Sequence, residues 1–248
     1  MFVFGSGVLF GKRTDISNAT PLNFGLVQEV STDLSFDTKM LYGQYAFPVA
    51  IARGKAKFTA KAKMARVSGL VMANLFLGVT PTVGQALTAF AEPHSVASSG
   101  ALTITVTQAA TFVEDWGVVY AATGLPLTVV SSGPTLGTYS VNPVTGVYTF
   151  SAADAGAALL FNYTYSTTTA GTQQLTIINP LMGTTPTFEA QLYTTFNGLP
   201  MNIKLFQCVS SKLSLGTKLD DFMIPEIDFD ILANAAGNVG TMSFGDVS

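Results

Sequence analysis

The side chains best placed to do chemistry are carboxylates and amines that recur at alternate positions. Acidic residues alternate with apolar ones in residues 28–37 and 224–231, and basic residues do so between residues 53 and 63. A period of two is typical of a half-buried strand, which turns one face to the core and the other to solvent. Each stretch therefore predicts a strand with one charged face. The charged positions are Glu29, Asp33 and Asp37, then Glu226, Asp228 and Asp230, and finally Lys55, Lys57, Lys61 and Lys63.

These rows suggest three kinds of chemistry. Carboxylates could bind a hard cation, but alternate residues on a strand lie about 6.5–7 Å apart, too far to close on one ion. The lysine row could bind nucleic acid, yet its face carries no aromatic residues and the chain is acidic, with a pI near 5.0. A plain solvated face is the default for each row. Pairing between acidic and basic rows, within one chain or between subunits, is the simpler account of both.

Catalysis has little support in this sequence. The single histidine, His94, follows Glu92 and Pro93 at the entry to a predicted loop, where we expect a surface residue. Cys208 lies in an apolar strand pattern that favours a buried thiol. No nucleophile elbow, zinc-protease motif or phosphate-binding loop is found in the sequence. We therefore expect no enzyme activity, no cofactor and no metal.

The composition points to burial of surface by partners. Only 11% of the 248 residues are charged, against about 25% in an ordinary soluble domain. The chain also holds 18 Phe and 8 Tyr. Its longest apolar stretch, residues 69–79, is well short of the ~20 residues that a spanning helix needs, and no secretory signal is recognised at the start. The composition favours a self-assembling protein made in the cytoplasm.

Charge is distributed unevenly along the chain. Residues 1–66 carry nine Lys and Arg against four acids, and residues 204–248 carry three lysines against six acids. Residues 67–203 contain five acids and no Lys or Arg. This pattern predicts a core formed by both ends of the chain around an insertion. The predicted boundaries are 1–92 and 181–248 for the core and 93–180 for the insertion.

The insertion is rich in strand and turn signals. Strands are predicted at 102–107, 127–130, 159–165 and 173–178, and a hairpin at 139–150. Short strands at this spacing favour a small β-sandwich. The spacing of Asp154, Gly156 and Tyr163 is similar to that of the corner turn of immunoglobulin-like domains.

The core stretches contain one predicted helix. Ser68 can cap a helix that runs to Leu77, with Gly78 as the stop. Near the C-terminus, a turn at 235–240 leads into a last predicted strand at 241–244.

Taken in order, the core stretches resemble a major tail tube protein of long-tailed, siphovirus-type bacteriophages. The resemblance covers about 60% of the chain and has no single diagnostic motif. The segments that carry it in the first part of the core are Gly25–Val30, Leu41–Gln44, Phe47–Val49, Arg53–Lys55 and Ser68–Gly78. Those in the second part are Asn179–Gly183, Pro186–Phe188, Ser211–Leu215, Lys218–Phe222, Ile224–Glu226 and Ala236–Gly237. Within the insertion, Asp115–Val118, Tyr139, Tyr148–Phe150 and Asp154–Gly156 resemble an accessory segment of phage structural proteins.

The resemblance implies a mainly β fold, with a tail-tube β-barrel or sandwich, a flanking α-helix and an inserted immunoglobulin-like β-sandwich. It also implies hexameric rings that stack into the tail tube, the conduit for genome ejection. The partners would be other copies of the chain and other tail proteins: tape measure, terminator and baseplate. Double-stranded DNA would pass through the lumen without specific binding, and no membrane insertion is implied. The location would be the virion tail, assembled in the cytoplasm of the bacterial host.

For such a tube, an acidic wall prevents DNA from sticking, because each Lys or Arg facing DNA would exchange counterions for a contact. We expect one acidic row, Glu226/Asp228/Asp230 or Glu29/Asp33/Asp37, to face the lumen, and the four lysines to lie between subunits or rings. The insertion is expected on the tube exterior, where it could recognise something neutral such as a glycan. The main alternative is another virion part: a tail terminator, a baseplate hub or a capsid decoration protein. A secreted or outer-membrane adhesin is a weaker alternative.

Overall fold

The computed structural model describes residues 5–66, 68–169 and 171–245. Strands make up 54% of the protein and form several antiparallel sheets, with one short helix, so the prediction of a mainly β protein is confirmed. No closed barrel is found within those residues. The chain divides into two compact units: unit 1 comprises Met1–Pro81 and Leu175–Ser248, and unit 2 comprises Thr82–Gln174. The predicted insertion, 93–180, overlaps unit 2 but begins and ends later.

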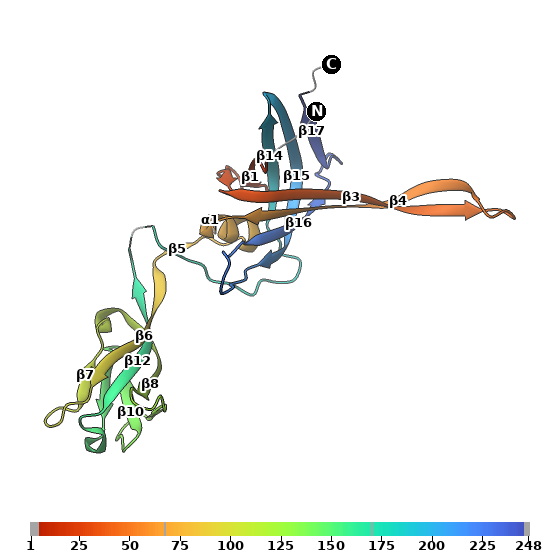
Figure 1. The fold of residues 1–248 in the computed structure, drawn as a ribbon. Helices are drawn as coiled ribbons and strands as arrows, with labels where there is room; N and C mark the ends of the chain where they lie inside the picture. Colours follow the sequence, from red (N-terminus) through yellow and green to blue (C-terminus); the bar gives the residue numbers. More distant parts are fainter. Residues whose placement is uncertain (1–4, 67, 170, 246–248) are drawn as a thin grey trace. The chain divides into compact units, whose positions relative to one another are not determined.

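Unit 1 is built on one eight-stranded sheet in the order β2-β1-β14-β15-β16-β4-β3, with β17 also paired to β15 (Figure 1). Strands from the two ends of the chain are thus hydrogen-bonded side by side. The strands are β1 (Val8–Arg13), β2 (Leu22–Asn23), β3 (Val27–Tyr42), β4 (Pro48–Met64), β14 (Thr187–Phe196), β15 (Leu199–Ser214), β16 (Glu226–Leu232) and β17 (Gly240–Phe244).

The core of unit 1 lies on one face of this sheet. Alternate residues of β4, namely Ala60, Ala62 and Met64, are buried there. The neighbouring strand β16 contributes Ile227 and Phe229 in the same alternation. Both patterns agree with the period of two in the sequence. The half-buried strand predicted at 28–37 is only partly confirmed, because Val30 packs against the core whereas Leu34 and Phe36 are exposed.

A short helix packs against this core. α1 (Gly69–Val71) continues directly into one π-helical segment, η1 (Met72–Leu77), whose Leu75 side chain joins the core. The Ser68 hydroxyl accepts a hydrogen bond from the Val71 N–H, and Gly78 ends the helix in the left-handed region at φ 68°. The predicted start, stop and extent of the helix are confirmed; its wider π-helical second part was not predicted. None of the helices among the described residues is long and apolar enough to cross a membrane.

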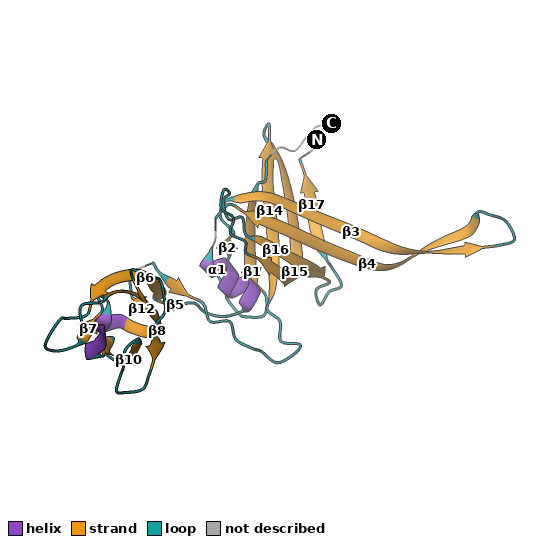
Figure 2. Cartoon of the chain, turned by 60° about the horizontal axis from the view of Figure 1, so that its bottom comes forward, coloured by secondary structure: helices purple, strands orange, loops and turns teal. Residues whose placement is uncertain are grey.

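Strands β3 and β4 form a hairpin that continues beyond the rest of the sheet (Figures 1 and 2). β16 pairs with β4 only between Lys63 and Thr59. Beyond that point the two strands have only each other as hydrogen-bonded neighbours. Every residue from 31 to 57 except Pro48 is exposed. The outer part of the hairpin is therefore a two-stranded ribbon with no core of its own.

Unit 2 contains two sheets that share one core. One sheet has the order β6-β12-β8 and the other β7-β11-β10-β9. Phe161 of β12 meets Tyr148 of β11 edge to face at 4.9 Å between ring centroids. The strands are β6 (Gln85–Ser95), β7 (Thr103–Thr105), β8 (Phe112–Tyr120), β9 (Thr128–Val129), β10 (Thr138–Asn142), β11 (Val147–Phe150) and β12 (Ala158–Thr167). A separate short pair joins β5 (Thr82–Val83) to β13 (Gln173–Gln174).

Most strand predictions for this unit are confirmed, with changed bounds. The hairpin at 139–150 forms β10 and β11, while the strand expected at 173–178 is limited to two residues. The Pro93 position, where the insertion was predicted to begin, lies inside β6. β6 is an edge strand, and proline is tolerated there because its missing N–H leaves no partner unpaired.

Two aspartates of unit 2 accept hydrogen bonds from tyrosines. The hydroxyls of Tyr139 and Tyr148 donate to Asp115 at 2.5 and 2.8 Å. Tyr120 donates to Asp154 at 2.5 Å, and Asp154 is only 2% exposed. Burial, followed by the nearby Asp115 carboxylate, raises the pKa of both Tyr139 and Tyr148. These hydroxyls therefore stay protonated and act as donors.

Glu92 is held in a third such network. Its carboxylate accepts from the Tyr163 hydroxyl at 2.6 Å and from the Thr107 backbone N–H at 2.8 Å, and it lies 2.6 Å from Nε2 of His94. Partial burial alone would raise the pKa of Glu92, but these hydrogen bonds outweigh burial and lower the pKa to about 2. Glu92 is therefore ionised across the neutral range.

Candidate interaction surface

The face of the unit 1 sheet opposite its core collects the charged rows. The register places Lys63 of β4 between Glu29 of β3 and Glu226 of β16. Two residues along, Lys61 lies opposite Asp228. We call this surface, on β3, β4, β16 and β15, the charged face. The rows that were predicted separately from the sequence thus become neighbours on one surface.

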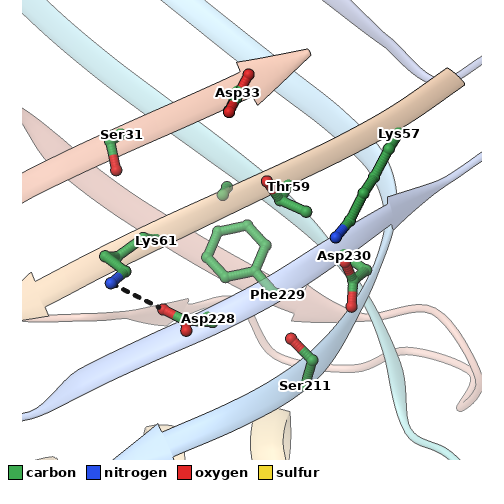
Figure 3. Close-up of a pocket in the computed structure, with 10 residues that line it drawn as sticks. Ser31, Asp33, Lys57, Thr59, Lys61, Ser211, Asp228, Phe229 and Asp230 are labelled. Atoms are coloured by element: carbon green, nitrogen blue, oxygen red, sulfur yellow. Dashed lines mark ion pairs between the residues drawn. The ribbon is translucent and has the colours of Figure 1, made fainter. Parts of the chain in front are cut away.

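The lysines of the charged face form ion pairs within the chain. Lys61 Nζ lies 2.8 Å from Glu226 and 3.8 Å from Asp228, and Lys63 Nζ lies 2.6 Å from Glu29. Figure 3 shows the pair between Lys61 and Asp228 and the Lys57 side chain extending toward Asp230. Pairing of the acidic and basic rows within one chain is thus observed for Lys61 and Lys63.

The ion pair between Lys61 and Glu226 shifts the pKa of both groups. The hydrogen bond to Glu226 raises the pKa of Lys61, and the same bond lowers the pKa of Glu226. Asp228 differs, because its Oδ1 atom is buried and has no hydrogen-bond partner among the described residues. The 3.8 Å separation from Lys61 is an ion-pair distance and is too long for a hydrogen bond.

A groove of about 410 Å³ opens on the charged face (Figure 3). Its walls carry both signs of charge: Asp33 from β3, Lys57 and Lys61 from β4, and Asp228 and Asp230 from β16. Carboxylates of both acidic rows and two of the lysines therefore share one surface of unit 1. Asp37 and Lys55 lie farther out, on the exposed part of the hairpin.

The outer part of the β3–β4 hairpin carries exposed apolar side chains. Tyr45 and Phe47 at its turn are 73% and 83% exposed, and Leu41, Val49 and Ile51 are also exposed. We call these five residues the hairpin tip. In the sequence, this segment stood out only for its family resemblance. The signal that could have identified it is the run of apolar residues where a hairpin turn ordinarily carries polar ones.

An apolar groove of about 370 Å³ lies at the base of the same hairpin. Leu34 and Phe36 of β3 and Phe58 of β4 line one side, and Leu205 and Met242 line the other. Phe58 and Leu205 also pack in the core of unit 1, so the groove is an open continuation of that core. Unit 1 thus presents an apolar groove and an apolar hairpin tip at separate places.

The two residues considered for catalysis, His94 and Cys208, both pack against core side chains. His94 lies within β6, packs edge to face on Phe161 at 5.3 Å and contacts Glu92. The expectation of a loop at His94 was therefore wrong, because β6 runs from Gln85 through Glu92 and Pro93 to Ser95; the imidazole itself is partly exposed. Cys208 is buried and free as predicted, and burial raises the pKa of its thiol to about 12.

No family model matches the sequence, and no curated protein matches it either. The function is therefore inferred from the residues and contacts described above. The features of unit 1 that bear most directly on function are the exposed hairpin and the charged face.

Proposed function

We propose that this chain is a structural virion protein that polymerises as stacked hexameric rings into the tail tube of a long-tailed bacteriophage. The observation that carries the proposal is the β3–β4 hairpin, whose outer part is exposed on both faces. Its strands have 16 and 17 residues, which at about 3.4 Å per residue gives a hairpin about 50 Å long. The order of core segments that resemble tail tube proteins supports the same assignment.

The hairpin needs a partner for physical reasons. A two-stranded ribbon is marginally stable at best in water, and its free edges offer unpaired backbone groups to another chain. Its exposed tip, with Tyr45 and Phe47, adds apolar surface that a monomer would leave in water. Contacts between unlike patches of identical subunits close into rings or continue as filaments. A ring of subunits that exchange hairpins covers both the edges and the apolar tips.

The charged face suits the wall of a DNA conduit. Lys61 and Lys63 are already paired with Glu226 and Glu29, so they gain little by contacting phosphate. Asp228 and the other carboxylates of this face repel a phosphate backbone within the screening length of ~8–10 Å. We therefore place the charged face, with Glu29, Asp33 and the row Glu226/Asp228/Asp230, toward the lumen. Lys55, farther out on the hairpin, remains a candidate for contacts between subunits or rings.

Unit 2 is proposed as an immunoglobulin-like module on the tube exterior. Its two sheets share a core of their own, and its short β5–β13 pair joins Thr82 to Gln174 at the point where the unit begins and ends. A unit with adjacent ends can be inserted into a host fold without disturbing it. If unit 2 lay inside the channel it would block the passage of DNA, and if it lay between subunits it would block the ring contacts.

Assembly of the purified protein tests the proposal. The wild type is expected to form long tubes in negative-stain electron micrographs and to sediment as large particles. A Tyr45→Ser/Phe47→Ser variant should stay dispersed, because its hairpin tip no longer drives association. Val144→Ser, which removes an equally exposed apolar residue from unit 2, should polymerise like the wild type. A wild type that stays monomeric at high concentration, or a tip variant that polymerises normally, would contradict the proposal.

Deletion of unit 2 tests its proposed place. Because Thr82 pairs with Gln174, a short glycine linker can join Pro81 to Leu175. Tubes should still form, with a thinner outline. A folded, soluble deletion protein that forms no tubes would show that unit 2 takes part in the ring contacts.

A further inference from the structure

The outer face of the three-stranded sheet of unit 2 carries two exposed aromatic rings. Phe90 of β6 is 85% exposed, and Trp116 of β8 is 64% exposed. The two strands flank β12 on either side (Figure 1). Since neighbouring strands are 4.7–4.9 Å apart, the backbones that carry the rings are about 10 Å apart. The rings thus form two separate apolar surfaces on one sheet face.

A pair of β-bulges places both rings opposite one residue of β12. Phe90 and Ala91 on one side, and Trp116 and Gly117 on the other, face the single Asn162 where the register shifts. The Asn162 side chain accepts from the Ala91 N–H at 3.0 Å and donates to the Gly117 carbonyl at 3.3 Å. Bulges commonly re-aim a side chain next to a functional site. Asn162 therefore fixes the position of both rings from the middle of the sheet.

The indole of Trp116 is further restrained. Its Nε1–H donates to the Thr164 hydroxyl at 2.6 Å. Thr164 of β12 pairs with Thr88 of β6 on one side and with Glu114 of β8 on the other. Hydroxyl and carboxylate groups therefore lie beside the rings, and the indole is held in place before any ligand arrives. Preorganisation of this kind reduces the entropy lost on binding.

Charge and area narrow the choice of ligand. Residues 82–174 contain no Lys or Arg, so the surface offers no cation to a phosphate or another anion. Two aromatic side chains supply about 300–500 Å² at most, well below the ~800 Å² per partner of a stable protein interface. A ligand that fits has small apolar faces, hydroxyl groups at its edges and no charge. Pyranose rings joined in a chain have this chemistry.

We propose that Phe90 and Trp116 form a binding platform for a neutral saccharide chain. The C–H faces of two sugar rings stack on the two aromatic rings, and their hydroxyls bond to Glu114 and Thr88. Apolar and aromatic surfaces with a few polar groups that set orientation are typical of small-ligand sites. The site lies wholly in unit 2 and does not depend on the tube assignment.

The single tryptophan of the chain makes the test direct, because Trp116 itself reports on the site. The full-length protein is titrated with cellohexaose, maltohexaose and chitohexaose while its intrinsic fluorescence is recorded. At least one sugar should change the emission in a saturable way at millimolar concentration. The change should persist at high salt, since no charge pair is involved. If none of the three sugars changes the emission, the proposal is wrong.

Two variants assign the signal to the platform. Phe90→Ala keeps the Trp116 reporter and should weaken binding about tenfold or more, as for a central aromatic contact. Its melting temperature should not change, because Phe90 is almost fully exposed. Val144→Ala, on the turn of the other sheet, should bind like the wild type. Wild-type affinity in Phe90→Ala would overturn the proposal, as would a response to tetramethylammonium alone, which would indicate a cation–π site instead.

Discussion

On the charged face of unit 1, Glu29, Glu226 and Asp228 lie near solvent and pair with lysines. In unit 2, Glu92, Asp115 and Asp154 lie in or beside the core and accept hydrogen bonds from tyrosines. Glu226 and Asp228 face Lys61 on an open sheet surface. Asp115 and Asp154 are reached by hydroxyls instead. Unit 2 has no Lys or Arg, so neutral donors are what it can offer an ionised group. Loss of a carboxylate should therefore lower the free energy of unfolding much more in unit 2 than in unit 1.

The physical reason is the dielectric environment. An exposed ion pair typically contributes 0–1 kcal/mol, because water screens it and two long side chains lose freedom. A buried donor left without an acceptor costs about 1–3 kcal/mol, since it has lost its hydrogen bonds to water. The fluorescence of Trp116 reports the unfolding of unit 2, and circular dichroism at one protein concentration reports both units.

The largest effect is expected from Asp115→Ala. This change leaves the buried hydroxyls of Tyr139 and Tyr148 without their acceptor and should destabilise unit 2 by about 2–5 kcal/mol. Glu29→Ala in unit 1 is the matched change and should cost about 1 kcal/mol or less, because its pair with Lys63 is exposed. Chemical denaturation measures both.

A compensating variant sharpens this comparison. Replacing Tyr139 and Tyr148 by Phe in the Asp115→Ala background removes both unpaired hydroxyls. Most of the lost stability should return, because replacing both partners of a buried hydrogen bond by apolar groups is nearly neutral. If the triple variant is no more stable than Asp115→Ala, the hydroxyl network is not the source of the cost.

The next effect is expected from Glu92→Gln, with a defined pH dependence. The amide cannot replace an ionised acceptor of three hydrogen bonds, so unit 2 should lose about 2 kcal/mol at neutral pH. The folded-state pKa of Glu92 is lowered from 4.5 to about 2, so its contribution is complete above pH 4.5 and is lost as the pH falls toward 2. Melting temperatures of wild type and variant should therefore converge in acid. A constant difference down to pH 2 would contradict this account.

A smaller effect is expected from Tyr120→Phe. Asp154 loses one hydroxyl donor but keeps the Gly137 N–H at 3.2 Å, so the cost should be about 1–2 kcal/mol. Tyr193→Phe, which removes an exposed hydroxyl from unit 1, serves as the control and should leave stability unchanged. Equal melting temperatures for the two variants would show that the bond to Asp154 is not stabilising.

The smallest effect is expected from Lys63→Met. Its pair with Glu29 is exposed, so stability should change by about 0–1 kcal/mol, and the difference should vanish at high salt. Urea midpoints at low and high salt measure this change. A loss that persists at high salt would mean that the charged face is much less hydrated than its exposure indicates.

Local features were predicted well from the sequence. Strands β3, β4 and β16 and the helix that begins after Ser68 follow from side-chain alternation and capping, both of which depend on neighbours a few residues away. The apolar residues of β16 and of the inner half of β4 pack in the core as expected, whereas Leu34 and Phe36 of β3 are exposed. Whether the acidic and basic rows would pair within one chain or between subunits was left open, because that depends on which strands become neighbours.

The prediction of a loop at His94 was wrong for a related reason. Its immediate neighbours, Glu92 and Pro93, read as the start of a loop, yet pairing with β12 carries β6 through them. The partners of Asp115 were also beyond sequence reasoning, because Tyr139 and Tyr148 come from the opposite sheet. The bulges beside Asn162 shift the alternation of β6 and β8, so the outward direction of Phe90 and Trp116 could not be read from a strict period of two.

The sequence by itself determined that the protein is mainly β, that its strands have one charged and one apolar face, and that its middle part lacks cations. These properties follow from composition and from the pleat, which acts over a few residues. Only the tertiary structure decided that Glu29 and Glu226, almost two hundred positions apart in the chain, lie on either side of the same lysine strand. Strand order and register are set by packing between distant segments, and one bulge is enough to change which face a side chain joins.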